Sequence, residues 1–159
     1  MLTIVKADYA NPDHADTVLS MTSEYARDPM GMEEELEDEV KENLIREMSL
    51  FPGTMSLIAY LDGKPAGLAN CVYSFSTFAA KKVLNVHDLA VLPEMRGQGI
   101  GRKLLEAVIE QAQQTDCCKV TLEVREDNRA RRLYERCGFS VGDPAMYFMT
   151  CELDEESGR

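Results

Sequence analysis

Residues 84–102 read Leu-Asn-Val-His-Asp-Leu-Ala-Val-Leu-Pro-Glu-Met-Arg-Gly-Gln-Gly-Ile-Gly-Arg. The stretch opens as an apolar strand, and an amphipathic helix is predicted directly after it, over residues 101–114. Between the two, Gly97, Gly99 and Gly101 allow a tight turn and leave successive N–H groups uncovered. Those N–H groups stand at a helix start, where the helix dipole also favours an anion. The stretch therefore predicts a cradle for a pyrophosphate group.

Two well-known phosphate-binding loops do not match this stretch. A Walker loop ends in Gly-Lys-Ser/Thr, and that ending is missing here. The dinucleotide-binding loop has the spacing GxGxxG, whereas this loop has GxGxG preceded by Arg96. The loop is therefore neither a nucleoside-triphosphate loop nor a dinucleotide loop of the usual kinds.

Periodicity on either side of the loop predicts the rest of the fold. Before it, a strand, two helices and three strands are expected, and after it helix, strand, helix and final strands. This order indicates an α/β fold in which helices flank a mixed central sheet. The expected strands are 2–7, 54–61, 65–76, 83–92, 119–124, a short one at Val141, and 145–153; the expected helices start at Asn11-Pro12 and cover 33–51, 101–114 and about 128–138.

Composition restricts the protein's partners. The chain has 159 residues, which suits one domain, and its formal net charge is −11. Such an acidic chain is a poor binder of nucleic acid or anionic membranes, which attract basic surfaces. No apolar run approaches the roughly 18 residues of a membrane span, and the first residues do not read as a signal peptide. We expect a cytoplasmic protein without nucleic-acid or membrane partners.

The cysteines and histidines do not form a metal-binding pattern. Five cysteines are present, an odd number, and no CxxC or CxxH pair occurs. Only two histidines occur, at positions 14 and 87. We expect reduced cysteines that act as small core residues, and no metal site.

Three motifs together resemble the GNAT superfamily of acyl-CoA-dependent N-acyltransferases. Arg96–Gly101 matches the family's Arg/Gln-x-x-Gly-x-Gly/Ala element, and Asn128–Phe139 is similar to its Asn-x-x-Ala-x-x-Leu-Tyr-x-x-x-Gly-Phe element. The approach Asp88–Pro93 also matches. The resemblance implies a single GNAT-type domain over residues 1–153, with a mixed, mostly antiparallel sheet flanked by helices, and a short polar tail at 154–159.

The resemblance also implies acetyl-CoA as co-substrate. In this family the strand before the loop splays from its neighbour, and its backbone groups pair with the pantetheine arm, while the loop takes the pyrophosphate. The implied cofactor-binding residues are Leu89, Ala90, Val91, Arg96, Gly97, Gln98, Gly99, Ile100, Gly101, Arg102, Asn128 and Tyr134. Asn128 is alternatively a helix N-cap, and both roles are compatible.

Two catalytic residues are expected. The resemblance implies that Tyr134 protonates the departing thiolate, although the apolar spacing around it also suits a core aromatic. His87 is the expected general base because imidazole, with an ordinary pKa of about 6.5, suits taking a proton near neutrality. Asp88 and Glu123 are alternatives for the base. Strand alternation predicts that His87 and Asp88 point to opposite faces.

The expected reaction is direct acetyl transfer from acetyl-CoA to a primary amine in a ternary complex. A small-molecule amine is the expected acceptor, and the negative charge of the chain favours a cationic one. Two alternatives stay open: a non-catalytic acetyl-CoA-binding or regulatory module, and an acyltransferase that uses a longer acyl-CoA. Relatives commonly dimerise, so a homodimer is also expected.

Overall fold

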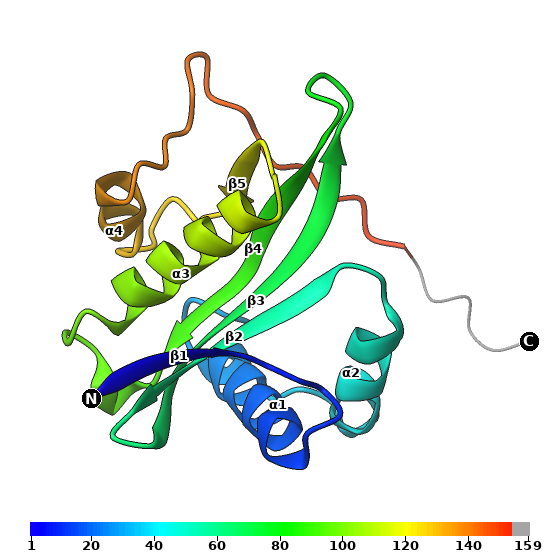
Figure 1. Ribbon diagram of the computed structural model, residues 1–159, viewed down its shortest axis with the longest axis vertical. Helices are drawn as coiled ribbons and strands as arrows, with labels where there is room; N and C mark the ends of the chain where they lie inside the picture. Colours follow the sequence, from blue (N-terminus) through cyan, green and yellow to red (C-terminus); the bar gives the residue numbers. More distant parts are fainter. Residues whose placement is uncertain (154–159) are drawn as a thin grey trace, which may run out of the picture.

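The computed structural model describes residues 1–153, and the predicted tail 154–159 lies outside the described residues. Within that range the chain forms one sheet with helices on both sides (Figure 1). The strands are β1 (Leu2–Lys6), β2 (Thr54–Leu61), β3 (Lys64–Ser76), β4 (Lys81–Val91) and β5 (Lys119–Leu122). The helices are α1 (Pro12–Arg27), α2 (Asp38–Leu50), α3 (Ile100–Gln114) and α4 (Arg131–Arg136), with a 3-10 turn at Pro93–Met95.

The five strands of the described range lie in sequence order across the sheet. Strands β1 to β4 pair antiparallel, and β4 pairs parallel with β5. A parallel neighbour requires a crossover, and α3 supplies it. The predicted mixed, mostly antiparallel sheet is confirmed.

The sheet separates two hydrophobic cores. Adjacent residues on one strand belong to different cores, as Leu57 and Ile58 do on β2, because side chains alternate between faces. The larger core packs α3 and α4 against one face, and the smaller core packs α1 and α2 against the other (Figure 1). Gly67 on β3 permits a close fit, since a Cβ there would lie 2.9 Å from Leu104 Cδ1 on α3.

Helix α1 begins as predicted. The Asn11 side chain accepts hydrogen bonds from the backbone N–H groups of Asp13 and His14, and Pro12 occupies the first turn. These contacts satisfy backbone donors that have no partner within the helix. They fix where α1 starts, and its buried face then carries Val18 and Met21 against the sheet.

Helix α2 differs from its prediction in two ways. It starts at Asp38 rather than Glu33, because the backbone N–H groups of Met32 and Glu34 turn back to the Ala26 carbonyl at the end of α1. The predicted buried stripe is also only partly correct. Leu36, Leu44 and Met48 are half-buried, whereas Val40 and Phe51 are exposed.

The C-terminal strands predicted at Val141 and over residues 145–153 are wrong. Residues 140–153 form neither strand nor helix, and Met146, Tyr147, Phe148 and Met149 are exposed. Strand propensity reflects fit to a pleated surface beside a partner, and no strand within residues 1–153 pairs with this segment. The segment's apolar composition alone therefore misled the prediction.

The helix before that segment is also shorter than predicted. We expected a helix from about residue 128 to Gly138, whereas α4 covers Arg131–Arg136. The Asn128 side chain accepts a hydrogen bond from the Ala130 N–H, 2.9 Å away, and so forms a turn in front of the helix. Across residues 1–153, no helix has the length and apolar character needed to cross a membrane.

Candidate active site

Strand β4 and the edge strand β5 separate at one end of the sheet. The pairing of β4 with β5 runs from Val83, opposite Lys119, to Val86, opposite Leu122. Beyond Val86, β4 continues to Val91 without β5 beside it. On its other side β4 stays paired with β3, where Leu89 faces Ala69. Within residues 1–153, the backbone beyond Val86 therefore has one edge without a strand partner, as the resemblance implied.

The glycine loop joins this splayed end to α3. Gly97 and Gly99 both have φ near +77°, a left-handed conformation that glycine adopts without steric cost. Gly99 is the N-cap of α3, and its carbonyl accepts the Lys103 N–H at 3.1 Å. Ile100 is buried in the larger core and anchors the start of the helix. The first N–H groups of α3 have no partner within the helix, and such groups at a helix start suit an anion.

A cavity of about 790 Å³ lies in the wedge between β4, the loop and the segment before α4. That volume falls in the range of ordinary ligand pockets. It brings together eleven of the residues predicted from the sequence: Leu89, Ala90, Val91, Arg96, Gly97, Gly99, Ile100, Gly101, Arg102, Asn128 and Tyr134. Gln98 sits in the loop without lining the cavity, and His87 does not line it either.

Tyr134 is both a core residue and a cavity residue. Its side chain is 8% exposed, and its ring packs edge-to-face against Phe139 with centroids 6.2 Å apart. Burial, and then the nearby Tyr25, raise the pKa of the Tyr134 hydroxyl to about 12. The hydroxyl therefore keeps its proton throughout the neutral range and is available as a donor.

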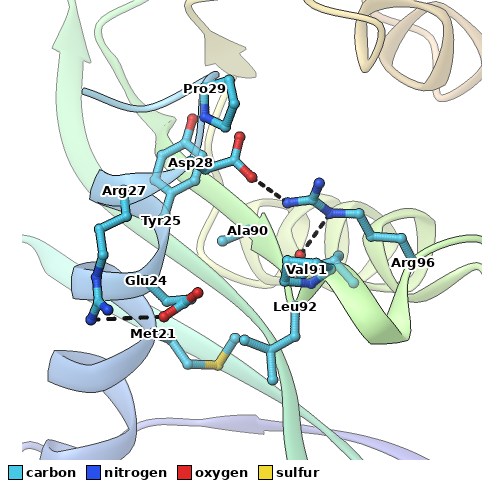
Figure 2. A pocket seen from close by; sticks show the side chains of 11 residues that line it. Met21, Glu24, Tyr25, Arg27, Asp28, Pro29, Ala90, Val91, Leu92 and Arg96 are labelled. Carbon is cyan, nitrogen blue, oxygen red and sulfur yellow. Dashed lines mark hydrogen bonds and ion pairs between the residues drawn. The ribbon is translucent and has the colours of Figure 1, made fainter. Parts of the chain in front are cut away.

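A second, smaller cavity of about 220 Å³ adjoins the first on the α1 side of the sheet. Arg96 lines both cavities. Figure 2 shows its two contacts: Nε donates to the Val91 carbonyl at 3.1 Å, and the guanidinium pairs with Asp28. Burial opposes ionisation of Asp28, but the hydrogen bonds from Arg96 and the Met30 N–H prevail and lower its pKa. Arg96 thus links the glycine loop to the end of α1.

The three candidate bases occupy different settings on the sheet. The register of β4 shifts so that Asn70 faces Asp88 while Cys71 faces Val86, which leaves His87 as the extra residue of a β-bulge. Because of this bulge, Val86 and Asp88 lie on opposite faces. The strict alternation that underlay the prediction of opposed His87 and Asp88 side chains therefore fails here.

The surroundings of the three candidates also differ. His87 is exposed, whereas Asp88 is half-buried and accepts a hydrogen bond from Asn70 Nδ2 at 3.0 Å. Glu123 lies just beyond β5, where Asn85 donates to it at 3.0 Å. The sequence alone could not separate these settings, because each depends on contacts between strands.

The sequence analysis missed several residues that line the cavities, and two of these line both. They are Tyr25, at the end of α1, and Asp28, directly after it. A signal existed, since Met21 and Tyr25 are four residues apart on one face of a predicted helix. The sequence could not show that this face meets β4 beside Ala90 (Figure 2).

Comparisons with known proteins agree with this architecture. The chain is similar to an uncharacterized N-acetyltransferase of Archaeoglobus fulgidus, with 44% identity over 80 residues that cover 49% of this chain and 54% of that protein. The chain thus matches about half the length of this curated relative. A solved probable acetyltransferase has a TM-score of 0.81 at 22% identity, covering 96% of this chain and 99% of its own.

A solved aminoglycoside N-acetyltransferase in complex with CoA has a TM-score of 0.73 at 16% identity, covering 94% of this chain and 95% of its own. At these identities the two solved structures show a shared fold. A family model described as the acetyltransferase (GNAT) family matches residues 18–139, which include the splayed strand, the glycine loop and Tyr134. The chain belongs to the acetyltransferase (GNAT) family.

Proposed function

We propose that this protein is an N-acetyltransferase that moves an acetyl group from acetyl-CoA directly to a primary amine in a ternary complex. The observation that carries the proposal is one cavity in which a splayed strand, a glycine loop at a helix start and a buried tyrosine meet. Each of these three features meets a different chemical group of acetyl-CoA. No other cofactor is needed.

The cavity offers a separate set of groups to each part of acetyl-CoA: the pyrophosphate, the pantetheine arm and the thioester. The N–H groups at the start of α3 and the Arg102 side chain would hold the pyrophosphate. The unpaired edge of β4 at Leu89 and Val91 would hydrogen bond to the pantetheine amides, as an added strand would. The Asn128 amide lines the same cavity and would contact that arm. One β4 N–H group would then face the thioester oxygen and stabilise negative charge there.

Tyr134 is the proposed general acid. Its hydroxyl stays protonated at neutral pH, with a pKa of about 12. Tyr134 lines the same cavity as Leu89 and Ala90. The same high pKa makes it a reluctant acid, since a thiol has an ordinary pKa of about 8.5. We therefore expect proton delivery to sulfur to be late, with a benefit near the lower end of the range for general acids, about 10²-fold.

The acceptor amine must lose a proton, and His87 is the proposed base, directly or through one water. Its exposed imidazole sits in the β4 bulge next to the segment that would hold the thioester. Bulges re-aim side chains near active sites, which supports this role. Asp88 and Glu123 are the alternatives, and the pH dependence of His87 variants separates them.

Direct transfer is favoured over a covalent acyl-enzyme. The cysteine nearest the β4 bulge is Cys71, which pairs with Val86, and it is 1% exposed. Burial, and then the Asp88 carboxylate, raise the pKa of the Cys71 thiol to about 12. Since the thiolate is the nucleophile, this thiol would be inert at neutral pH.

The proposed partners follow from charge and setting. A small, cationic amine suits a chain of net charge −11, and the free thiols of all five cysteines suit the reducing cytoplasm. A homodimer is part of the proposal, by analogy with the family.

The direct test is CoA release from acetyl-CoA in the presence of an amine panel that includes a polyamine, amino acids, an aminoglycoside and a peptide with a free N-terminus. The proposal predicts release that depends on one amine class and on acetyl-CoA. Tight acetyl-CoA binding without release would instead identify a binding module. Faster turnover with a longer acyl-CoA would identify a different acyl donor.

A further inference from the structure

A chain of polar side chains crosses the sheet face that packs against α1. Tyr9 and Ser56 share a hydrogen bond of 2.9 Å between their hydroxyls, and Ser56 Oγ donates to Asn70 Oδ1 at 2.7 Å. Asn70 Nδ2 in turn donates to Thr22 Oγ1 and to Asp88 Oδ2, each at 3.0 Å. The amide of Asn70 thus uses its oxygen and both of its N–H groups, and the chain ends on the carboxylate of Asp88.

This chain lies within an apolar layer. Ser56 is fully buried and Asn70 is 5% exposed, and Ile58 and Leu68 on the same face are fully buried. Burying polar groups among such neighbours costs free energy unless every one of them is hydrogen bonded. An apolar layer of the same shape would be at least as stable, so stability does not explain the chain. A satisfied network does, however, restrict a side chain to one orientation.

The side chain so restricted is Asp88, which stands at the active end of β4. Asn70 faces Asp88 and Leu68 faces Ala90, so Asp88 and Ala90 lie on the same face, about 7 Å apart along the strand. Ala90 lines both cavities. The carboxylate is therefore fixed on the α1 side of the strand that would hold the thioester.

The charge of Asp88 is left for another partner. Within residues 1–153 its carboxylate forms no ion pair, and the group that holds it, the Asn70 amide, is neutral. Ala90, two residues further along the same face of β4, lines both cavities, as does Tyr25. A carboxylate without an ion partner next to this part of the cavity wall suits an alkylammonium ion.

We propose that Asp88 binds the ammonium group of the acceptor on the α1 side of β4, and that Asn70 is the positioning residue that fixes it. The inference rests on the proposed acetyl transfer and adds to it the residues that hold the acceptor's ammonium group. His87, which precedes Asp88 on β4, stays the proposed base.

Butylammonium chloride and 1-butanol provide a matched pair of probes. Alkylamines have an ordinary pKa near 10, so at pH 7 one probe is a cation and the other a neutral isostere. With CoA-saturated protein, NMR should show butylammonium shifting the Asp88 and Ala90 amides and the Asn70 side-chain amide at millimolar concentration. Butanol should leave these signals unchanged.

The decisive variant is Asp88→Asn, which keeps the size of the side chain and an oxygen for Asn70 and removes only the charge. It should weaken butylammonium binding at least tenfold. Asn70→Ala should weaken it threefold to tenfold. Since that variant removes one hydrogen bond each from Ser56 and Thr22, its folding is checked by thermal unfolding. Glu110→Gln, which removes a charge from the exposed surface of α3, should change nothing. Unchanged binding in Asp88→Asn would overturn the inference.

Turnover separates this inference from the proposed function. With the best amine of the panel, Asn70→Ala should raise the amine KM about tenfold and leave the acetyl-CoA KM unchanged. A structural role alone would affect both substrates or neither. Absence of turnover together with Asp88-dependent cation binding would refute the proposed function and support the inference. Normal amine KM in Asp88→Asn would refute the inference and leave acetyl transfer intact.

Discussion

The two sides of the candidate site are built from different parts of the chain: mainly backbone groups on one side and side chains on the other. On the loop side, which comprises residues 89–91 and 97–102, the wall consists largely of backbone: an unpaired strand edge and the N–H groups of a helix start. On the α1 side, the wall includes the side chains of Tyr25 and Asp28, and Asp88 lies on the same face of β4 as the wall residue Ala90. Contacts between distant segments hold Asp28 and Asp88. A backbone-built wall is encoded by a short local motif, whereas a side-chain-built wall depends on the whole fold.

This difference predicts how the two sides respond to mutation. Changes on the loop side should affect acetyl-CoA and leave the amine untouched, and changes on the α1 side should do the reverse. The effects should also differ in size. A negative charge introduced into the glycine loop would repel the whole pyrophosphate of acetyl-CoA. A single side chain on the α1 side supplies only one of several contacts to the amine.

The largest effect is expected from Gly99→Asp. A carboxylate beside the α3 N–H groups would repel the pyrophosphate and occupy its space, so we expect acetyl-CoA affinity to fall more than about 100-fold, measured by calorimetry. Gly63→Asp is the matched control, because Gly63 has the same φ of +77° and open space around its Cα, but lies in the β2–β3 turn. Equal acetyl-CoA affinities for the two variants would show that the glycine loop does not bind acetyl-CoA.

The next effect is expected from Tyr134→Phe. The ring should still pack against Phe139, so acetyl-CoA affinity should be unchanged while kcat falls about 10²-fold. With a pKa of about 12, Tyr134 stays protonated until the pH rises through that value, so it should add no basic limb to the kcat profile between pH 6 and 10. Tyr73→Phe, on β3, is the control. If Tyr134→Phe turns over at the rate of the unmodified protein, Tyr134 is not the general acid and serves only in packing.

The next effect is expected from His87→Gln, which tests the proposed base. If His87 is the base, the acidic limb of the kcat profile with saturating amine should vanish or move, and acetyl-CoA binding should persist. The loss of rate should reach about tenfold to 100-fold. If the acidic limb of the kcat profile stays at the same pH, His87 is not the general base, and Asp88 or Glu123 takes that role. The variant should fold normally because the imidazole is exposed.

The smallest effect is expected from Asp28→Asn, which removes the link between the two sides. Ion pairs near a surface contribute little, so the free energy of unfolding should fall by about 1 kcal/mol or less at pH 7. The Asp28 pKa is lowered in the folded state, so this contribution exists above the ordinary pKa of about 3.9 and is lost as the pH falls through the folded value. Urea unfolding of both proteins at pH 7 and at pH 3 should therefore show a difference that shrinks with acid.

What could be predicted from the sequence follows the same division. The glycine loop, the strand before it and the helix after it were predicted because glycine spacing and apolar periodicity are local properties. The position of Asp28, the bulge at His87 and the bonds of Asn70 were not, because they arise where α1 and β3 meet β4. The C-terminal strands were wrongly predicted for the opposite reason: local strand propensity was present, but no strand within residues 1–153 pairs with that segment.

Hydrogen–deuterium exchange with and without acetyl-CoA tests the central claim most directly. If the loop side alone holds the cofactor through its backbone, acetyl-CoA should protect amides in residues 89–91, 97–102 and 128–134. The amides of α1 up to residue 24 and of β1 to β3 should exchange as before. Protection confined to α1 and β2, with the loop unchanged, would contradict the account.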